Sequence, residues 1–153
     1  RPPADREERA RLVDRVLPAE LGADDYAAAR YTPLASWARV PLKPVVRTER
    51  DAVVIELRAA GFEKTLRFAA DGSLTAKYAW YPGTYPAGAW FAPELSLAAV
   101  VPLVCHPAVE PWRYEIRTVA KSERGLRASV QGVALTPRWP IALGAAHLEL
   151  PAP

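Results

Sequence analysis

Apolar and polar side chains alternate with a period of two over several stretches after residue 45, which is typical of strands with one buried face. The same alternation returns near residue 114, where Glu115 and Arg117 separate the apolar positions. The sequence therefore predicts a series of antiparallel strands joined by turns. On each predicted strand, one set of alternating residues lies on the same face. These residues are Val53, Ile55, Leu57, Leu66, Phe68, Leu74, Ala76, Tyr78, Trp80, Tyr114, Ile116 and Thr118.

The turn at Asp71-Gly72 can be assigned from parity. A two-residue loop would pair Phe68 with a polar threonine, whereas a three-residue loop of residues 70–72 pairs Phe68 with Leu74. Because a slip of one residue moves every side chain to the other face, burial favours the three-residue loop. Such a loop needs a left-handed residue, so we expect a positive φ at Gly72.

The segment before residue 18 has a different pattern. Asp5 and Glu8 have the spacing of a helix N-cap, and Pro18 would end the helix. The apolar residues between them predict one short helix near the N-terminus. They are Leu12, Val13, Val16 and Leu17.

Taken together, the elements predict an all-β fold, an antiparallel β-sandwich with one short N-terminal helix. We expect a single domain over residues 1–153, in which residues 1–44 are a helix and an extended lead-in and residues 45–153 form the sheets. The chain contains 16 prolines, which suit strand ends and edges rather than helices. It begins Arg1-Pro2-Pro3 and has no methionine, so we expect it to be part of a longer protein.

Charge indicates which classes of partner to expect, and cysteine content indicates the cellular compartment. The net charge is +3, and the basic residues around the predicted turn Ser122–Gly125 are interleaved with other residue types, so we expect neither a nucleic-acid nor a membrane partner. Cys105 is the only cysteine, which excludes an internal disulfide and favours a cytoplasmic protein.

Several segments in order resemble one known family. They are RLVDRVL (11–17), LRF (66–68), DGSL (71–74), KY (77–78), FAPELSLA (91–98), TV (118–119), SE (122–123), Gly125, QG (131–132) and Trp139. In these residues the chain resembles the C-terminal β-sandwich domain of family-57 glycoside hydrolases, the α-amylase and 4-α-glucanotransferase family.

The resemblance implies a supersandwich of the galactose-mutarotase type that stands behind a catalytic barrel. The family's catalytic carboxylates belong to that barrel, so the resemblance implies no catalytic residue in this chain. The implied partners are the barrel of the parent chain and an α-glucan.

Aromatic residues crowd the stretch from residue 80 to residue 91, together with prolines and glycines. Aromatic faces stack on the apolar face of pyranose rings, and we therefore name Tyr81, Tyr85 and Trp90 as candidate carbohydrate-binding residues. The alternative is that Trp80 and Phe91 are core anchors and the loop is a rigid connection.

Glu94 interrupts an apolar strand and is a fourth candidate for carbohydrate binding. It is either a buried, hydrogen-bonded carboxylate or a group that points into a concave face. On this kind of fold, sugar epimerases use a glutamate with histidines, but the sequence does not place His106 or His147 near Glu94. No set of residues has metal-ligand spacing. Asp24 and Asp25 could suggest calcium, but an acidic cap on a short turn explains them more simply, so we predict no metal and no cofactor.

The function predicted from the sequence is a non-catalytic accessory domain of a family-57-like α-amylase or 4-α-glucanotransferase. It would pack on the catalytic barrel and present aromatic side chains to the glucan. Two alternatives stay open: an independent carbohydrate-binding module, and a small mutarotase-like enzyme that uses Glu94 and a histidine.

Overall fold

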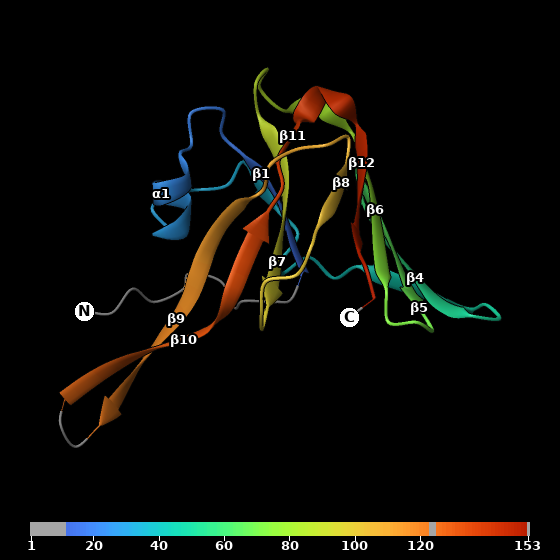
Figure 1. Ribbon diagram of the computed structural model, residues 1–153. Coiled ribbons are helices and arrows are strands. Elements are labelled where there is room, and N and C mark those ends of the chain that lie inside the picture. The colour runs from blue at the N-terminus through green and yellow to red at the C-terminus, as the bar shows by residue number, and fades with distance from the viewer. Residues whose placement is uncertain (1–11, 123–124, 153) are drawn as a thin grey trace. The chain divides into compact units, whose positions relative to one another are not determined.

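The computed structural model describes residues 12–122 and 125–152. Most of these residues lie in strands, which form two antiparallel sheets, so the predicted all-β, sandwich-like class is confirmed (Figure 1). Among the described residues, no helix has the length and the apolar content that crossing a membrane requires. The chain divides into two compact units, and each unit contains the main strands of one sheet.

The first unit comprises the described residues up to 38, together with 90–100 and 110–138. Its sheet has the strand order β2-β1-β7-β10-β9. Strands β9 and β10 form a long hairpin, seen in orange in Figure 1. The elements of this unit are β1 (Leu12–Leu17), α1 (Ala23–Ala27), β2 (Ala35–Ser36), β7 (Trp90–Leu97), β9 (Trp112–Ser122) and β10 (Gly125–Thr136).

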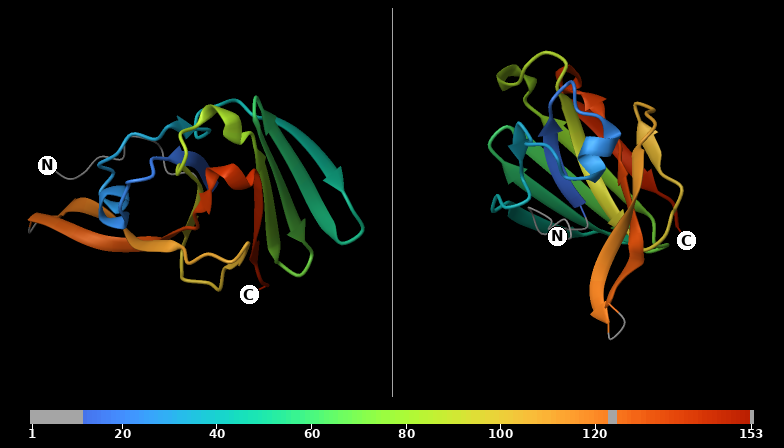
Figure 2. Two further views of the ribbon diagram at one scale, coloured as in Figure 1. Left: turned by 90° about the horizontal axis from the view of Figure 1, so that it is seen from above. Right: turned by 90° about the vertical axis from the view of Figure 1, so that its left-hand side faces the viewer.

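The second unit comprises residues 39–89, 101–109 and the described residues from 139 onward. Its sheet has the order β3-β4-β5-β6-β12-β8, and Figure 2 shows its first four strands side by side in teal and green. The elements of this unit are β3 (Lys43–Thr48), β4 (Ala52–Ala59), β5 (Phe62–Ala69), β6 (Leu74–Trp80), β8 (Val104–His106), β11 (Trp139–Pro140), β12 (Ala145–Leu150) and the 3-10 helices η1 (Pro82–Thr84) and η2 (Ile141–Leu143).

The helix predicted before Pro18 is wrong for residues 12–17, which form strand β1. This strand pairs with β2 on one side and β7 on the other, and residues 13–17 are all buried. A strand buried on both faces shows no alternation, so its apolar spacing imitates a helix. The cap residues Asp5 and Glu8 lie outside the described residues. The short helix that the structure has near the N-terminus is α1. Part of the segment expected to be an extended lead-in forms strands β1 and β2 of a sheet instead.

The hairpin between β5 and β6 has the predicted register. Phe68 lies opposite Leu74 and Leu66 lies opposite Ala76. The N–H of Ala69 donates to the carbonyl of Ser73 at 3.0 Å, which leaves a three-residue loop, and Gly72 has φ of 90°. Parity and burial were therefore sufficient to fix this register. In the β9–β10 hairpin Ser122 pairs with Gly125, while the predicted turn residues 123 and 124 lie outside the described residues.

Burial on the predicted faces of the second sheet is uneven. Leu66 and Ala76 are buried as expected, but Phe68 is 42% exposed and Val53 is 39% exposed. These two residues lie opposite each other near one end of the β4–β5 pair, where the apolar face is no longer covered. Phe68 thus shares the face of Leu66, as predicted, but it is not buried. Cys105 is a free, buried cysteine.

Candidate functional site

The aromatic loop after β6 presents one strongly exposed ring. Tyr81 is 63% exposed, and Tyr85 is half-buried at the other end of η1. A Cβ at Gly83 would come within 2.8 Å of the Tyr81 ring, so this glycine is the surface against which the ring lies. Trp80 is a core residue instead, because its Nε1 donates to the carbonyl of Ile141 at 2.7 Å in a buried position.

Trp90 belongs to the first unit and is half-buried. Its Nε1 donates to the carbonyl of Ala19 at 3.4 Å. The guanidinium of Arg138 lies 5.1 Å from the centre of the Trp90 ring and 3.7 Å from that of Trp112. Burial lowers the pKa of Arg138, but the group remains a cation that stacks on both indoles. One face of Trp90 is thus already in contact with the protein.

Glu94 is 4% exposed and lies in the middle of β7. Its Oε2 accepts hydrogen bonds from the hydroxyl of Tyr26 at 2.5 Å, the hydroxyl of Tyr114 at 2.9 Å and Nη1 of Arg15 at 3.3 Å. Arg15 is 8% exposed, so the ion pair is buried. Of the two readings of Glu94, the buried, hydrogen-bonded carboxylate is the one that the structure shows. We call Arg15, Tyr26, Glu94 and Tyr114 the Glu94 cluster.

Tyr26 makes further contacts besides its hydrogen bond to Glu94. Helix α1 carries it, and its ring stacks on Tyr31 at 5.0 Å and approaches Trp112 at 5.5 Å. Burial, and after it the negative charge of Glu94, raises the pKa of Tyr26. Tyr26 therefore stays a neutral hydrogen-bond donor. In the first turn of the same helix, Asp25 pairs with Arg30 at 2.8 Å.

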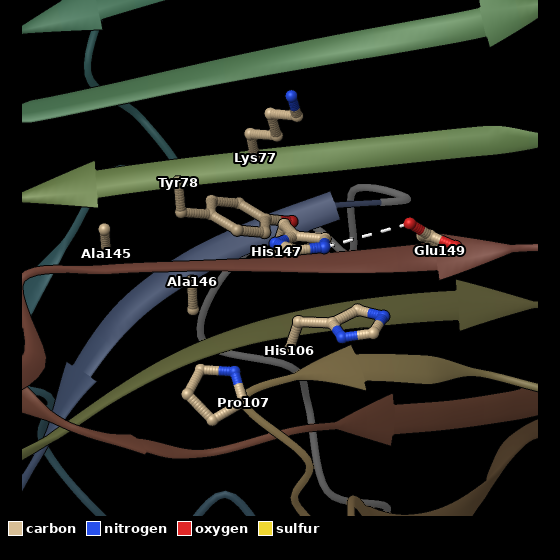
Figure 3. Close-up of a pocket in the computed structure, with 8 residues that line it drawn as sticks. All are labelled: Lys77, Tyr78, His106, Pro107, Ala145, Ala146, His147 and Glu149. Atoms are coloured by element: carbon tan, nitrogen blue, oxygen red, sulfur yellow. Dashed lines mark ion pairs between the residues drawn. The ribbon is translucent and has the colours of Figure 1, made fainter.

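A pocket of about 590 Å³ opens on the second unit, between β6, β8 and β12 (Figure 3). Both histidines of the chain line it. Their imidazole rings stack with centres 4.3 Å apart and planes 17° apart. The Nε2 of His147 lies 3.8 Å from Oε1 of Glu149. The other lining residues are Lys77, Tyr78, Pro107, Ala145 and Ala146.

The sequence analysis missed this grouping, although half of its signal was visible. His147 and Glu149 are two positions apart in a short strand, so they point to the same face. The other half depends on the pairing of β12 with β8, which places His106 directly opposite His147. Strand β8 has only three residues and is remote in sequence, so neither its existence nor its neighbour could be predicted.

The comparisons with known proteins concern the fold. No protein-family model matches the chain, and no curated protein does. Among solved structures, the chain is similar to part of a 4-α-glucanotransferase from Thermococcus litoralis, with a TM-score of 0.69 and 20% sequence identity. The match covers 95% of this chain and 28% of that chain. The fold is thus similar to that of one part of this glucanotransferase.

Proposed function

We propose that this chain is a non-catalytic accessory β-domain of an α-glucan-active enzyme of the family-57 glycoside hydrolase type. The observation that supports this most is the extent of the structural match, which takes in 95% of this chain but 28% of the glucanotransferase. The remainder of such an enzyme would supply the catalytic barrel, on which this domain would pack. The free, buried Cys105 is compatible with a cytoplasmic enzyme of this kind.

The family assignment is tested by the gene. We expect the reading frame that encodes residues 1–153 to encode a catalytic barrel upstream, and we expect glucan transfer or hydrolysis from the full product. A deletion of residues 1–153 from that product would then lower its stability or its activity on long glucans. A reading frame without any glycoside hydrolase barrel would overturn the proposal.

A second candidate, an independent carbohydrate-binding module, is favoured by one observation, the exposure of the Tyr81 ring. Its expected sugar contacts in the second unit are Tyr81 and Tyr85. The other two candidates, Trp90 and Glu94, belong to the first unit, where Glu94 is buried. The mutarotase-like alternative gains no support, because the carboxylate of Glu94 is buried and already accepts three hydrogen bonds.

Titration of the 153-residue chain with maltoheptaose distinguishes the two candidates. If the module binds sugar by itself, Tyr81→Ala weakens binding by about tenfold, which corresponds to the loss of one aromatic stacking contact of about 1.4 kcal/mol. Phe68→Ala is the matched control, since Phe68 is an exposed ring elsewhere in the same unit. Absence of maltoheptaose binding would reject the independent module and leave the packing role.

A further inference from the structure

The pocket of the second unit has the donor set of a transition-metal site, and it is separate from the aromatic residues considered above. Its donors are two imidazoles and one carboxylate. The set His₂Glu is one that Zn²⁺ uses in proteins, with an open fourth position for water or another ligand. We propose that His106, His147 and Glu149 bind one Zn²⁺ ion.

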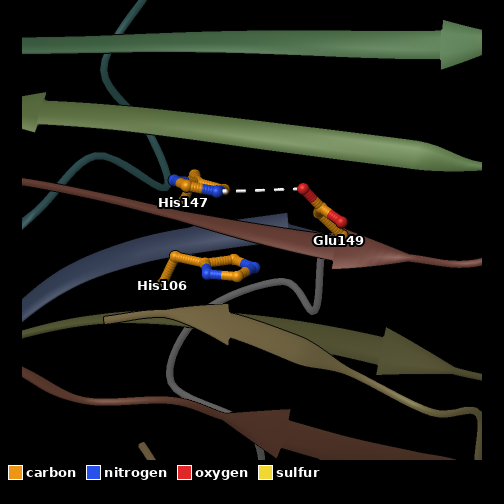
Figure 4. A group of neighbouring side chains, drawn as sticks. All are labelled: His106, His147 and Glu149. Atoms are coloured by element: carbon orange, nitrogen blue, oxygen red, sulfur yellow. Dashed lines mark ion pairs between the residues drawn. The ribbon is translucent and has the colours of Figure 1, made fainter. Parts of the chain in front are cut away.

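The backbone places the three side chains on one face. His147 and His106 are directly opposite each other in the antiparallel pair of β12 and β8. Opposed side chains in such a pair have Cβ atoms about 4.5–5.5 Å apart. Glu149 follows His147 by two positions on β12, so it shares the face. Figure 4 shows the three side chains together on this face.

The distances are close to those that an ion needs. One possible ligand atom from each residue lies within 4.8 Å of the other two. Donor atoms around a tetrahedral Zn²⁺ lie about 3.4 Å apart, because the metal–ligand distances are about 2.0–2.2 Å. Rotation of the imidazoles about χ2, a torsion with a broad range, supplies the remaining movement. The two rings stack with planes 17° apart, so this rotation must also tilt them out of the stack to aim both nitrogens at one ion.

The surroundings leave the donors accessible. The side chains of His147 and Glu149 are 38% and 49% exposed, and His106 is exposed as well. Lys77 is opposite His147 on β6 and is the cation nearest in register. Its long side chain is exposed, so its ammonium can remain in solvent. In Figure 3 this side chain points away from the imidazoles.

Binding of Zn²⁺ would change the stability of one edge of the second sheet. Strand β8 has three residues, lies at the end of its sheet and pairs with β12. An ion held by one donor from β8 and two from β12 would join the two strands. Zn²⁺ would therefore stabilise this edge of the second sheet against opening.

The test is a titration of the chain with ZnCl₂ in competition with a chromophoric chelator. The protein must carry no histidine tag, because its own two histidines are both in the site. We expect one Zn²⁺ per chain, and no comparable binding of Mg²⁺, which prefers oxygen ligands. Zn²⁺ at a large excess over its dissociation constant should raise Tm by at least about 4 °C.

Three variants remove one donor each: His106→Ala, His147→Ala and Glu149→Gln. Each should weaken Zn²⁺ binding by at least about tenfold, since even loss of an outer-shell partner of a metal site costs about 10–100-fold. Glu63→Gln is the control, because Glu63 is an exposed carboxylate of the same sheet on β5. The Glu63→Gln variant should bind Zn²⁺ with the same affinity as the unmodified chain.

Nuclear magnetic resonance of the unmodified chain gives a readout that depends on no variant. On addition of Zn²⁺, amide shifts should be concentrated in β8 and β12. The proposal is overturned if the unmodified chain binds no stoichiometric Zn²⁺, or if the histidine variants bind it equally well. Binding that survives Glu149→Gln at full strength would overturn the three-donor site.

Discussion

The Glu94 cluster and the His106–His147–Glu149 pocket each place one carboxylate beside at least one nitrogen-bearing side chain, yet they differ in burial. Glu94 is 4% exposed and accepts three hydrogen bonds at one oxygen. The Glu149 side chain is 49% exposed and lies 3.8 Å from an imidazole. A buried charge must be paired within the protein, whereas an exposed carboxylate keeps its hydration and can exchange it for a ligand.

The comparison separates a structural site from a candidate binding site. The Glu94 cluster joins β1, β7, β9 and α1, because its four members come from these elements. In the pocket, β8 pairs with β12 through three register pairs, and the side chains of His106, His147 and Glu149 are at least partly exposed. Substitutions should therefore change stability in the first region and ligand binding in the second.

The largest effect is expected from Glu94→Gln. The change removes the negative charge that pairs with the buried Arg15 guanidinium. Breaking a buried pair in this way costs about 3–5 kcal/mol of unfolding free energy. Urea unfolding followed by tryptophan fluorescence measures it. The matched change Glu149→Gln should stay within about 0.5 kcal/mol of the unmodified chain, as exposed substitutions usually do. Equal losses would contradict the comparison.

Tyr26→Phe should have the next largest effect, because it removes a hydroxyl that donates to a buried carboxylate. Hydrogen bonds to charged groups contribute about 1.5–3 kcal/mol, and Tyr114→Phe should cost less because Tyr114 is half-buried.

The raised pKa of Tyr26 predicts that the free energy of unfolding falls at alkaline pH. Since folding raises the pKa of Tyr26, its contribution is fully present below its unfolded pKa of about 10 and is lost as pH rises above it. Urea unfolding at pH 8 and pH 11 should show a smaller loss in Tyr26→Phe than in the unmodified chain. An identical loss in both would indicate that Tyr26 is not buried as described.

Gly132→Ala tests how tightly the strands beside Glu94 are packed. A Cβ at Gly132 would lie 2.2 Å from the backbone carbonyl oxygen of Leu97, and backbone cannot move aside as a flexible side chain can. Gly132 also follows the irregular register of β10 between residues 130 and 132. We expect a loss of about 1–3 kcal/mol, as for overpacked cores.

Gly22→Ala is the control for this substitution, since nothing lies within 4 Å of a Cβ at Gly22. Its unfolding free energy should change by less than that of Gly132→Ala. A reversed order in urea unfolding would show that β10 and β7 are not in the close contact described.

The smallest effect is expected in the hairpin of the second unit. The hydroxyl and then the N–H of Ser73 donate to Asp71 at 2.7 Å and 2.8 Å, which lowers the pKa of Asp71. Because folding lowers the pKa of Asp71, the ionised carboxylate stabilises the folded chain at pH values above its unfolded pKa of about 3.9. This stabilising contribution is lost as the pH falls through the folded-state pKa. Asp71→Asn should slightly reduce the loss of stability between pH 5 and pH 2. A larger loss in the variant would contradict this sign.

The parts of the fold that depend on local pattern could be predicted from the sequence. The register of Phe68 with Leu74 followed from alternation and one glycine, because a hairpin involves only neighbouring strands. The helix expected over residues 12–17 was wrong because β1 is buried on both faces and lacks alternation. Pattern alone does not distinguish such a strand from a short helix.

The candidate sites were predicted unequally for the same reason. Burial of Glu94 was one of the two readings that its apolar strand allowed, but its partners Arg15 and Tyr26 come from positions 79 and 68 residues away. The pairing of His106 with His147 depends on the order of strands in the sheet. Contacts between distant segments require the topology, which the sequence pattern did not provide.

One measurement tests the contrast between the two carboxylates most directly: thermal unfolding of Glu94→Gln and Glu149→Gln, each with and without ZnCl₂. We predict that Glu94→Gln has a lowered Tm that Zn²⁺ still raises, while Glu149→Gln has the original Tm and gains little from Zn²⁺. A Glu149→Gln protein that is as unstable as Glu94→Gln, or that is stabilised by Zn²⁺ as strongly as the unmodified chain, would contradict the distinction.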